Sequence, residues 1–297
     1  MEGLNTTGVA SNIIVDKKLS GKPHKGKVLA VIQSNLSDIP FFAGGTCAKL
    51  IDEGYTGYLI RTSNDEKSGT GSIFHNISTS EKENLRLAET LGFSDVFDLA
   101  YRQHEMNGIS QVELRGRLIY IFRLLKVDTV IKYNPSSEYE NNPDRWITGQ
   151  AVEQACFMAG NEYHYPEHEE AGLMPHPVND WYYIAAQSGQ SYNRVVDIGS
   201  TLEKKIDAIV ECKSHGVGDS GSMLRKRLAK EGKKLSILGN DDDTANSEYV
   251  RHFLLTSFKK NGENYNLPYA EKFMYFATED HHSKEVDDYI KKYAEKI

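Results

Sequence analysis

Residues 27 to 54 of the chain read KVLAVIQSNLSDIPFFAGGTCAKLIDEG, and this stretch decides the fold. Its apolar run, Val28 to Ile32, is too short for a helix and rich in β-branched residues, which predicts a buried strand. A polar crossing follows at Gln33 to Asp38, and after a pair of glycines the apolar spacing predicts a helix that ends before Gly54. This order indicates a βαβ unit. Ligands of such units bind at the carboxyl ends of the strands, so we expect the functional site around Gln33 to Asp38.

The rest of the chain continues the alternation of strands and helices. Further strands are predicted at Tyr58 to Arg61, Val96 to Leu99, Val127 to Tyr133, Trp181 to Ala185 and Arg194 to Ile198. Helices are predicted before Gly92, after the expected N-cap Ser110, through Ala151 to Met158, at Thr201 to Lys213, and around Ser222 to Lys230, Ser247 to Lys259 and His281 to Ile297. The pattern predicts an α/β fold with a Rossmann-like, doubly wound and mostly parallel sheet, followed by a C-terminal helical extension.

Composition suggests an N-terminal arm and limits the possible partners. We expect this arm, at 1–25, to be flexible. The 35 basic and 42 acidic residues give a net charge of −7, which argues against binding to nucleic acid. Three widely separated cysteines and the lack of an apolar leader or membrane-length run predict a cytoplasmic protein without a membrane partner.

Two motifs lie at strand ends and carry a family resemblance. The first is the Ala43-Gly44-Gly45-Thr46 end of the opening stretch, and the second is Asn142-Pro143-Asp144-Arg145 followed by QAVEQA. They resemble the two motifs of the PIG-L/LmbE-like family, the GlcNAc-PI de-N-acetylase type, written A-H-P-D-D-E with A-G-G-T, and H-P-D-H. The resemblance covers about residues 27 to 215 and fades beyond Gly216, so we expect an α/β domain at 26–215 and a helical extension at 216–297 packed on the same domain. It implies a Rossmann-like fold, zinc as cofactor and hydrolysis of the amide of an N-acetyl sugar.

The positions that match the family's chemical residues are mostly substituted. Asn35 stands where the family has a zinc-binding His, Ser37 stands where it has the catalytic Asp, and Asp38 matches its second Asp. In the second motif Asp144 matches, whereas Asn142 and Arg145 replace histidines, the latter a zinc ligand. An amide oxygen is a weak ligand and a permanent cation repels a dication, so we expect no zinc site here.

The candidate site residues follow from these motifs and from nearby polar residues. The catalytic candidates are Asp38, Ser37 and Asp144, and the substrate-binding candidates are Asn35, Arg145, Asn142, His104 and His176. We predict that the Arg145 guanidinium pairs with Asp38 in place of the metal. Two alternatives remain open. One is a relocated metal site made by Asp38, His164 and His168, and the other is Ser37 as a nucleophile activated by a His or a Lys, with His104 as the candidate.

The residues and the resemblance together suggest two functions from different classes. The first is a divergent relative that binds an amino sugar, a glycoconjugate or a similar polar metabolite, with the family's zinc-dependent hydrolysis lost or altered. The second is a non-catalytic pseudoenzyme that acts as a binding or partner subunit, as a homo-oligomer or beside an active paralogue. An additional group that supplies a metal or a base would favour the enzyme.

Overall fold

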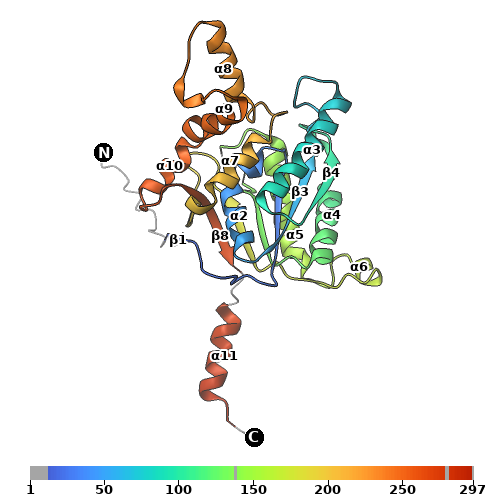
Figure 1. Ribbon diagram of the computed structural model, residues 1–297. Helices are drawn as coiled ribbons and strands as arrows, with labels where there is room; N and C mark the ends of the chain where they lie inside the picture. The colour runs from blue at the N-terminus through green and yellow to red at the C-terminus, as the bar shows by residue number, and fades with distance from the viewer. Residues whose placement is uncertain (1–12, 137–138, 278–280, 296–297) are drawn as a thin grey trace, which may run out of the picture.

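A computed structural model describes residues 13–136, 139–277 and 281–295 of the protein, without the side chains of 281–284. One sheet with the order β1-β7-β8-β6-β5-β2-β3-β4 forms its centre (Figure 1). The strands are β1 (Ile14–Asp16), β2 (Val28–Gln33), β3 (Thr56–Ser63), β4 (Asp95–Tyr101), β5 (Thr129–Tyr133), β6 (Asp180–Ile184), β7 (Arg194–Asp197) and β8 (Ala270–Ala277). All neighbouring pairs are parallel except the two that β8 makes. The predicted α/β fold with a mostly parallel sheet is confirmed.

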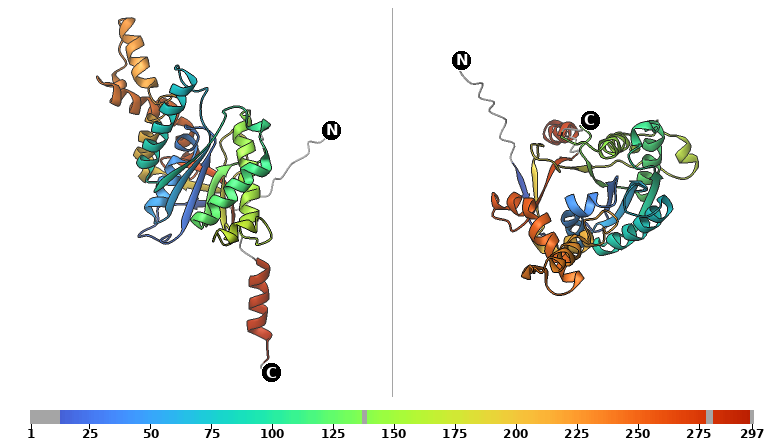
Figure 2. Two further views of the ribbon diagram at one scale, coloured as in Figure 1. Left: turned by 90° about the vertical axis from the view of Figure 1, so that its right-hand side faces the viewer. Right: turned by 90° about the horizontal axis from the view of Figure 1, so that it is seen from above.

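Helices cover both faces of this sheet (Figure 2). The α-helices are α1 (Asp38–Phe42), α2 (Gly44–Asp52), α3 (Ile73–Leu91), α4 (Gln111–Leu125), α5 (Pro143–Ala159), α6 (Glu167–Glu170), α7 (Leu202–Val210), α8 (Ser220–Lys230), α9 (Asp242–Tyr249), α10 (Thr256–Glu263) and α11 (His281–Tyr293). Short 3-10 turns lie at η1 (Met106–Gly108), η2 (Gly199–Thr201) and η3 (Ser236–Leu238), and a π-helical turn lies at η4 (Val250–Leu254). Ser110 caps α4 as predicted, because its hydroxyl accepts a hydrogen bond from the amide of Glu113.

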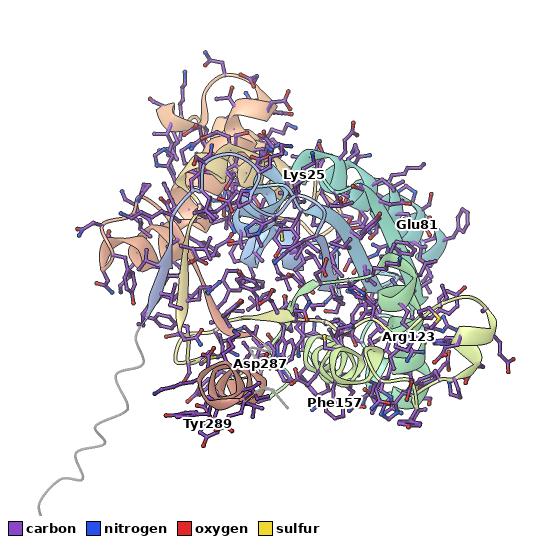
Figure 3. The ribbon with its side chains drawn as sticks, turned by 90° about the horizontal axis from the view of Figure 1, so that it is seen from below. Lys25, Glu81, Arg123, Phe157, Asp287 and Tyr289 are labelled. Carbon is purple, nitrogen blue, oxygen red and sulfur yellow. The ribbon has the colours of Figure 1, made fainter. Side chains whose placement is uncertain are left out.

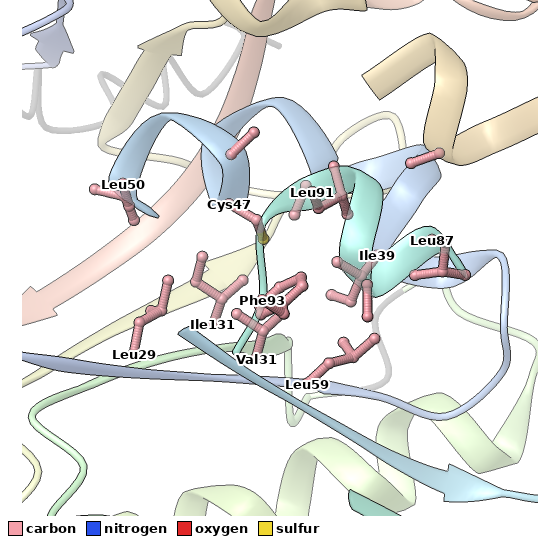
Figure 4. Close-up of a cluster of buried hydrophobic side chains, with 14 of the residues drawn as sticks. Leu29, Val31, Ile39, Cys47, Leu50, Leu59, Leu87, Leu91, Phe93 and Ile131 are labelled. Carbon is pink, nitrogen blue, oxygen red and sulfur yellow. The ribbon is translucent and has the colours of Figure 1, made fainter. Parts of the chain in front are cut away.

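The strand β2 divides the core into two layers. Its side chains alternate between the faces of the sheet, and all four of its central apolar residues are fully buried. Leu29 and Val31 pack with residues of α2 and α3 in the cluster of Figure 4, whereas Ala30 and Ile32 pack under α4 and α5. A strand buried on both faces reads as a continuous apolar run, which is why this element was predictable.

The order of the strands determines where a site can form. From β2 the chain moves outward to β3 and β4, and it then returns to place β5 on the other side of β2. The loops that follow β2 and β5 therefore diverge from the carboxyl edge at a topological switch point. Asp38 follows β2, and Arg145 lies in the first turn of the helix that follows β5.

The two terminal segments differ from expectation. Ile14–Asp16, inside the predicted flexible arm, pairs with β7 as a parallel edge strand. In the predicted helical extension, Ala270–Ala277 enters the sheet antiparallel between β6 and β7. The first strand has only three residues, too few for a recognisable pattern, and the second follows a run of helices that obscured its alternation. Residues 1–12 and 278–280 lie outside the described part of the chain.

The last helix, α11, extends away from the sheet at the end opposite α8 and α9 (Figure 1). Figure 3 shows it end-on, with Tyr289 labelled on it and Phe157 labelled on α5. Val286, Tyr289, Ile290 and Tyr293 are spaced as one helical stripe, and all are exposed. In the described part of the chain, no helix has both the length and the apolar character that a membrane crossing requires.

Candidate functional site

Asp38 and Arg145 form an ion pair at the switch point. Arg145 donates to Oδ1 of Asp38 from Nε, at 3.1 Å, and from Nη2, at 2.9 Å. The other oxygen, Oδ2, accepts hydrogen bonds of 2.8 Å from the Ser34 hydroxyl and from the Asn35 amide. Asp38 is fully buried, and its charge is the main reason that the pKa of Arg145 is raised. The predicted contact between these two residues is therefore present.

Neighbouring groups fix the orientation of the Arg145 guanidinium. Nη1 lies 3.4 Å from both carboxylate oxygens of Glu140, and the rings of Phe42 and Tyr133 each lie 5.4 Å from the guanidinium carbon. Tyr133 is almost fully buried, and burial followed by the nearby Asp38 charge raises the pKa of its hydroxyl. Aromatic rings and carboxylates on several sides hold the cation in one position.

The residues at the family's metal positions do not fit a zinc ion. Zinc needs carboxylate, thiolate or neutral imidazole donors, usually four in a tetrahedron. Here both oxygens of Asp38 already accept hydrogen bonds, and a cation that cannot lose its proton lies against one of them. The side-chain oxygen of Asn35 accepts from Ser63 and Gln103, each at 3.3 Å. Among the described residues, no group of three or more His, Cys, Asp or Glu is arranged to hold a metal.

Asp144 and Asn142 lie at the start of α5 and bond to the backbone. The carboxylate of Asp144 is fully buried and accepts from the amides of His104, at 2.7 Å, and Met106, at 3.3 Å. Burial raises the pKa of this carboxyl group. Asn142 caps the helix by accepting from the amide of Asp144 at 3.0 Å. The side chain of His104 is exposed, and its backbone adopts a φ of 60°. These contacts give Asp144 and Asn142 a structural role at the base of the site.

We expect Asp144→Ala to loosen the loop after β4 rather than to abolish binding at the site. The substitution leaves the amides of His104 and Met106 without an acceptor, which costs about 2 kcal/mol in the free energy of unfolding. Hydrogen exchange at these two amides should become much faster in the variant. Ser110→Ala is the matched control, since it removes a helix cap of about 1 kcal/mol at the other end of the same loop. Unchanged exchange at His104 in Asp144→Ala would contradict this role.

The three histidines at 164, 168 and 176 lie at the other edge of the sheet, so the prediction that placed His176 in the site is wrong. His176 lies 3.4 Å from Asp128, which immediately precedes β5 and accepts from the first amide of β2. The whole of β2, which rises about 3.3 Å per residue, therefore lies between His176 and Asp38. His168 lies beside Arg123 near the end of α4, an arginine that Figure 3 labels in the view from below. The relocated metal site of Asp38, His164 and His168 is therefore not assembled.

Ser37 contacts a histidine that the sequence had not indicated. Its hydroxyl lies 3.2 Å from Nδ1 of His215, in the segment after α7. The other ring nitrogen, Nε2, lies 3.3 Å from Oδ1 of Asp65, an ion-pair contact without the alignment of a hydrogen bond. Asp65 follows β3, so the three residues come from three separate loops at the carboxyl edge. In the described part of the chain, the side chain of His104, the histidine suggested by the sequence, makes no hydrogen bond with Ser37.

Asp65 is held rigidly as a carboxylate. Its Oδ2 accepts from Arg61, at 2.8 Å, from the Ser80 hydroxyl, at 2.9 Å, and from the Leu36 amide, at 3.1 Å. Burial by itself raises the pKa of Asp65, but the contacts with His215 and Arg61 outweigh burial and lower it. Asp65 therefore carries its negative charge against the ring of His215.

Two adjoining pockets open beside this group. One, of about 280 Å³, is lined mainly by apolar side chains, with Ser37 and Arg145 as its polar members; the others are Phe41, Phe42, Ile209, Cys212, Val217 and Leu254. The second, of about 390 Å³, shares Phe41 and Phe42 with it and has a more polar lining that includes Gln187, Ser188, Tyr192, Lys260, Asn261, Asn264 and Lys272. An apolar space therefore adjoins a polar one across two phenylalanines.

The sheet order and the site at its switch point define the class of protein: an α/β protein with the LmbE-like fold. The resemblance seen in the sequence is thus confirmed for the fold. No protein-family model matches the sequence, and no curated protein matches it significantly. Several solved structures, however, match this fold. The N,N'-diacetylchitobiose deacetylase from Pyrococcus horikoshii has a TM-score of 0.67 at 23% identity, with 84% of each chain covered.

Two other structures show how widely this fold is used. The conserved protein TT1542 from Thermus thermophilus has a TM-score of 0.61 at 18% identity, over 84% of this chain and 93% of that one. The 4-carboxy-2-hydroxymuconate hydratase GalB from Pseudomonas putida has a TM-score of 0.60 at 17% identity, over 84% and 95%. A hydratase and a deacetylase thus share one fold, so function must be argued from the residues of the site.

Proposed function

We propose that this chain binds an amino sugar, a glycoconjugate or a similar polar metabolite at the carboxyl edge of its sheet, without the zinc ion of the deacetylases. The observation that carries the proposal is the Arg145 guanidinium, which lies on Asp38 where the family has a metal ligand. A fixed cation in that position keeps the site folded and offers positive charge to a ligand oxygen. In this proposal, the substitution at position 145 removes one zinc ligand and also supplies a charge that a bound ligand can contact.

The lining of the polar pocket supports this ligand class. Sugars are recognised by amide and hydroxyl side chains that bond their hydroxyl groups and by aromatic rings that cover their apolar faces. The pocket combines Gln187, Asn261 and Asn264 with the rings of Phe41 and Tyr192. At about 390 Å³ it lies within the usual range of about 300–1,000 Å³ for small-molecule sites.

The first test is the metal content of the purified protein, followed by binding. We expect less than a tenth of an equivalent of zinc after incubation with excess zinc and dialysis. The metal-free protein should bind N-acetylglucosamine or glucosamine in calorimetry. Ser188→Trp, at an exposed position in the pocket lining, should weaken this binding at least tenfold, whereas Ser191→Trp, exposed in the same loop but outside the lining, should not.

Three results would overturn the proposal. One is stoichiometric zinc that is lost in Asp38→Ala, since it would show that the metal displaces Arg145. The second is the same affinity for the probes in Ser188→Trp as in the unaltered protein, and the third is no affinity in either, because in both cases the polar pocket would have no part in binding.

A further inference from the structure

We propose that Ser37, His215 and Asp65 form a metal-independent nucleophilic site that cleaves an ester linking a short acyl group to a polar metabolite. This inference rests on the proposed function, which supplies the polar half of the substrate. What it adds is the reaction, the cleavage of an ester bond. Its basis is the chain of contacts from the Ser37 hydroxyl to His215, at 3.2 Å, and from His215 to Asp65, at 3.3 Å. A nucleophile, a base and a group that orients the base are the parts that such catalysis needs.

The charge of Asp65 favours one of the two neutral tautomers of His215. A neutral imidazole has one N–H and one lone pair, and a carboxylate beside Nε2 favours the proton on that nitrogen. Nδ1 is then the acceptor, and it is the nitrogen that faces the Ser37 hydroxyl. Asp65 is itself fixed by Arg61 and Ser80. The contacts of Arg61 and Ser80 therefore keep Asp65 in place, and Asp65 favours the form of His215 that accepts a proton from Ser37.

Access and surroundings also suit a nucleophile. From residue 31 to residue 40, Ser37 is the one residue that is not buried, and its side chain lines the apolar pocket. Arg145 lines the same pocket, so its guanidinium can stabilise the negative oxygen that forms when a carbonyl is attacked. Ile209, Val217 and Leu254 are apolar members of the same lining, which suits a short acyl chain. The polar pocket beyond Phe41 and Phe42 would hold the alcohol part.

The reaction needs only water as a second reactant. The Ser37 oxygen bonds to the carbonyl carbon while its proton passes to Nδ1 of His215. The ester bond then breaks, and the alcohol leaves with that proton, so that the acyl group stays on Ser37. Water attacks the acyl group and gives a proton to His215. The bond to Ser37 breaks, Ser37 regains the proton, and a carboxylic acid is released.

The test joins hydrolysis of p-nitrophenyl acetate and butyrate to covalent labelling of the full chain. We expect diisopropyl fluorophosphate to add one phosphoryl group, located on Ser37 by peptide mass analysis. Hydrolysis should continue in EDTA and fall at least about a hundredfold in Ser37→Ala and in His215→Gln. His252→Gln is the matched control and should retain full activity. His252 also contacts a carboxylate, that of Glu248 at 3.1 Å, but it is absent from the lining of both pockets.

Hydrolysis that survives in Ser37→Ala would overturn the proposal, as would a folded native protein whose Ser37 takes no label. The labelling uses the unaltered chain, so it does not depend on whether a variant folds. Binding of N-acetylglucosamine without label or hydrolysis would refute this reaction and leave the proposed function standing. Labelling and hydrolysis without any sugar binding would support this reaction and refute the proposed function.

Discussion

Glu271→Ala should be among the most destabilising single substitutions in the chain. Glu271 and Lys205 are both fully buried, and the Lys205 ammonium lies 2.6 Å from Oε1 of Glu271. The same carboxylate accepts from the amides of Gly45, at 3.0 Å, and Thr46, at 2.8 Å, at the positive start of α2. Removal of one partner from a buried pair costs about 3–5 kcal/mol, a large part of the 5–15 kcal/mol that keeps a typical domain folded.

The neighbouring lysine supplies the control for this prediction. Lys204 bonds Asp52 at 2.7 Å, but both side chains are about two-fifths exposed. We therefore expect Asp52→Ala to cost less than about 1 kcal/mol. Urea unfolding measures both variants, and Glu271→Gln/Lys205→Met should recover much of the loss because it leaves no buried charge. Equal urea midpoints for Glu271→Ala and Asp52→Ala would contradict the importance of this buried pair.

Asn35→His/Arg145→His should bind about one equivalent of zinc, whereas we expect the unaltered chain to bind less than a tenth of an equivalent. The double variant removes the cation that lies on Asp38 and supplies two imidazoles, which together with Asp38 make the three-residue ligand set of a zinc enzyme. Elemental analysis after dialysis measures the zinc content. Cobalt substitution reports the geometry, because tetrahedral cobalt absorbs strongly in the visible range.

A variant with one imidazole fewer tests whether zinc binding needs all three ligands. Asn35→His/Arg145→Met removes the same cation but supplies only two of the three zinc ligands. We therefore expect it to retain less than a tenth as much zinc as the two-histidine variant. Asp38→Ala added to the two-histidine variant should also abolish binding. A folded two-histidine variant that takes up no zinc would show that residues 35, 38 and 145 do not meet at one metal position. Arg145 could then not be said to occupy the place of a metal ion.

Much of the fold could be predicted, because β2 is buried on both faces and its sequence is therefore a continuous apolar run. The pair of Asp38 and Arg145 was also predictable, since two motifs placed them at neighbouring strand ends and their charges are opposite. His215 was not, because 178 residues separate it from Ser37, and it follows a helix with no motif around it. Only the packing of α7 against the site brings the two together.

The histidines after α5 could have been placed correctly from the order of the elements. In a βαβ unit the helix returns the chain to the amino edge of the sheet, so the residues between α5 and β6 must lie far from the site. Proximity in sequence to the second motif suggested otherwise. For β8, the length of chain between it and β6 hid the pairing, since almost a third of the chain separates Tyr182 from its partner Tyr275.

The position of β8 also bears on when the protein becomes competent to bind. This strand follows all the others in the chain, yet it lies between β7 and β6, so the sheet is in two pieces until β8 inserts. Such late, long-range pairing is entropically costly and slow. The polar pocket is lined by Lys272 of β8 and by the loop that joins the two pieces. We therefore expect the ligand pocket to form in the last step of folding, so that partly folded chains cannot compete for the ligand.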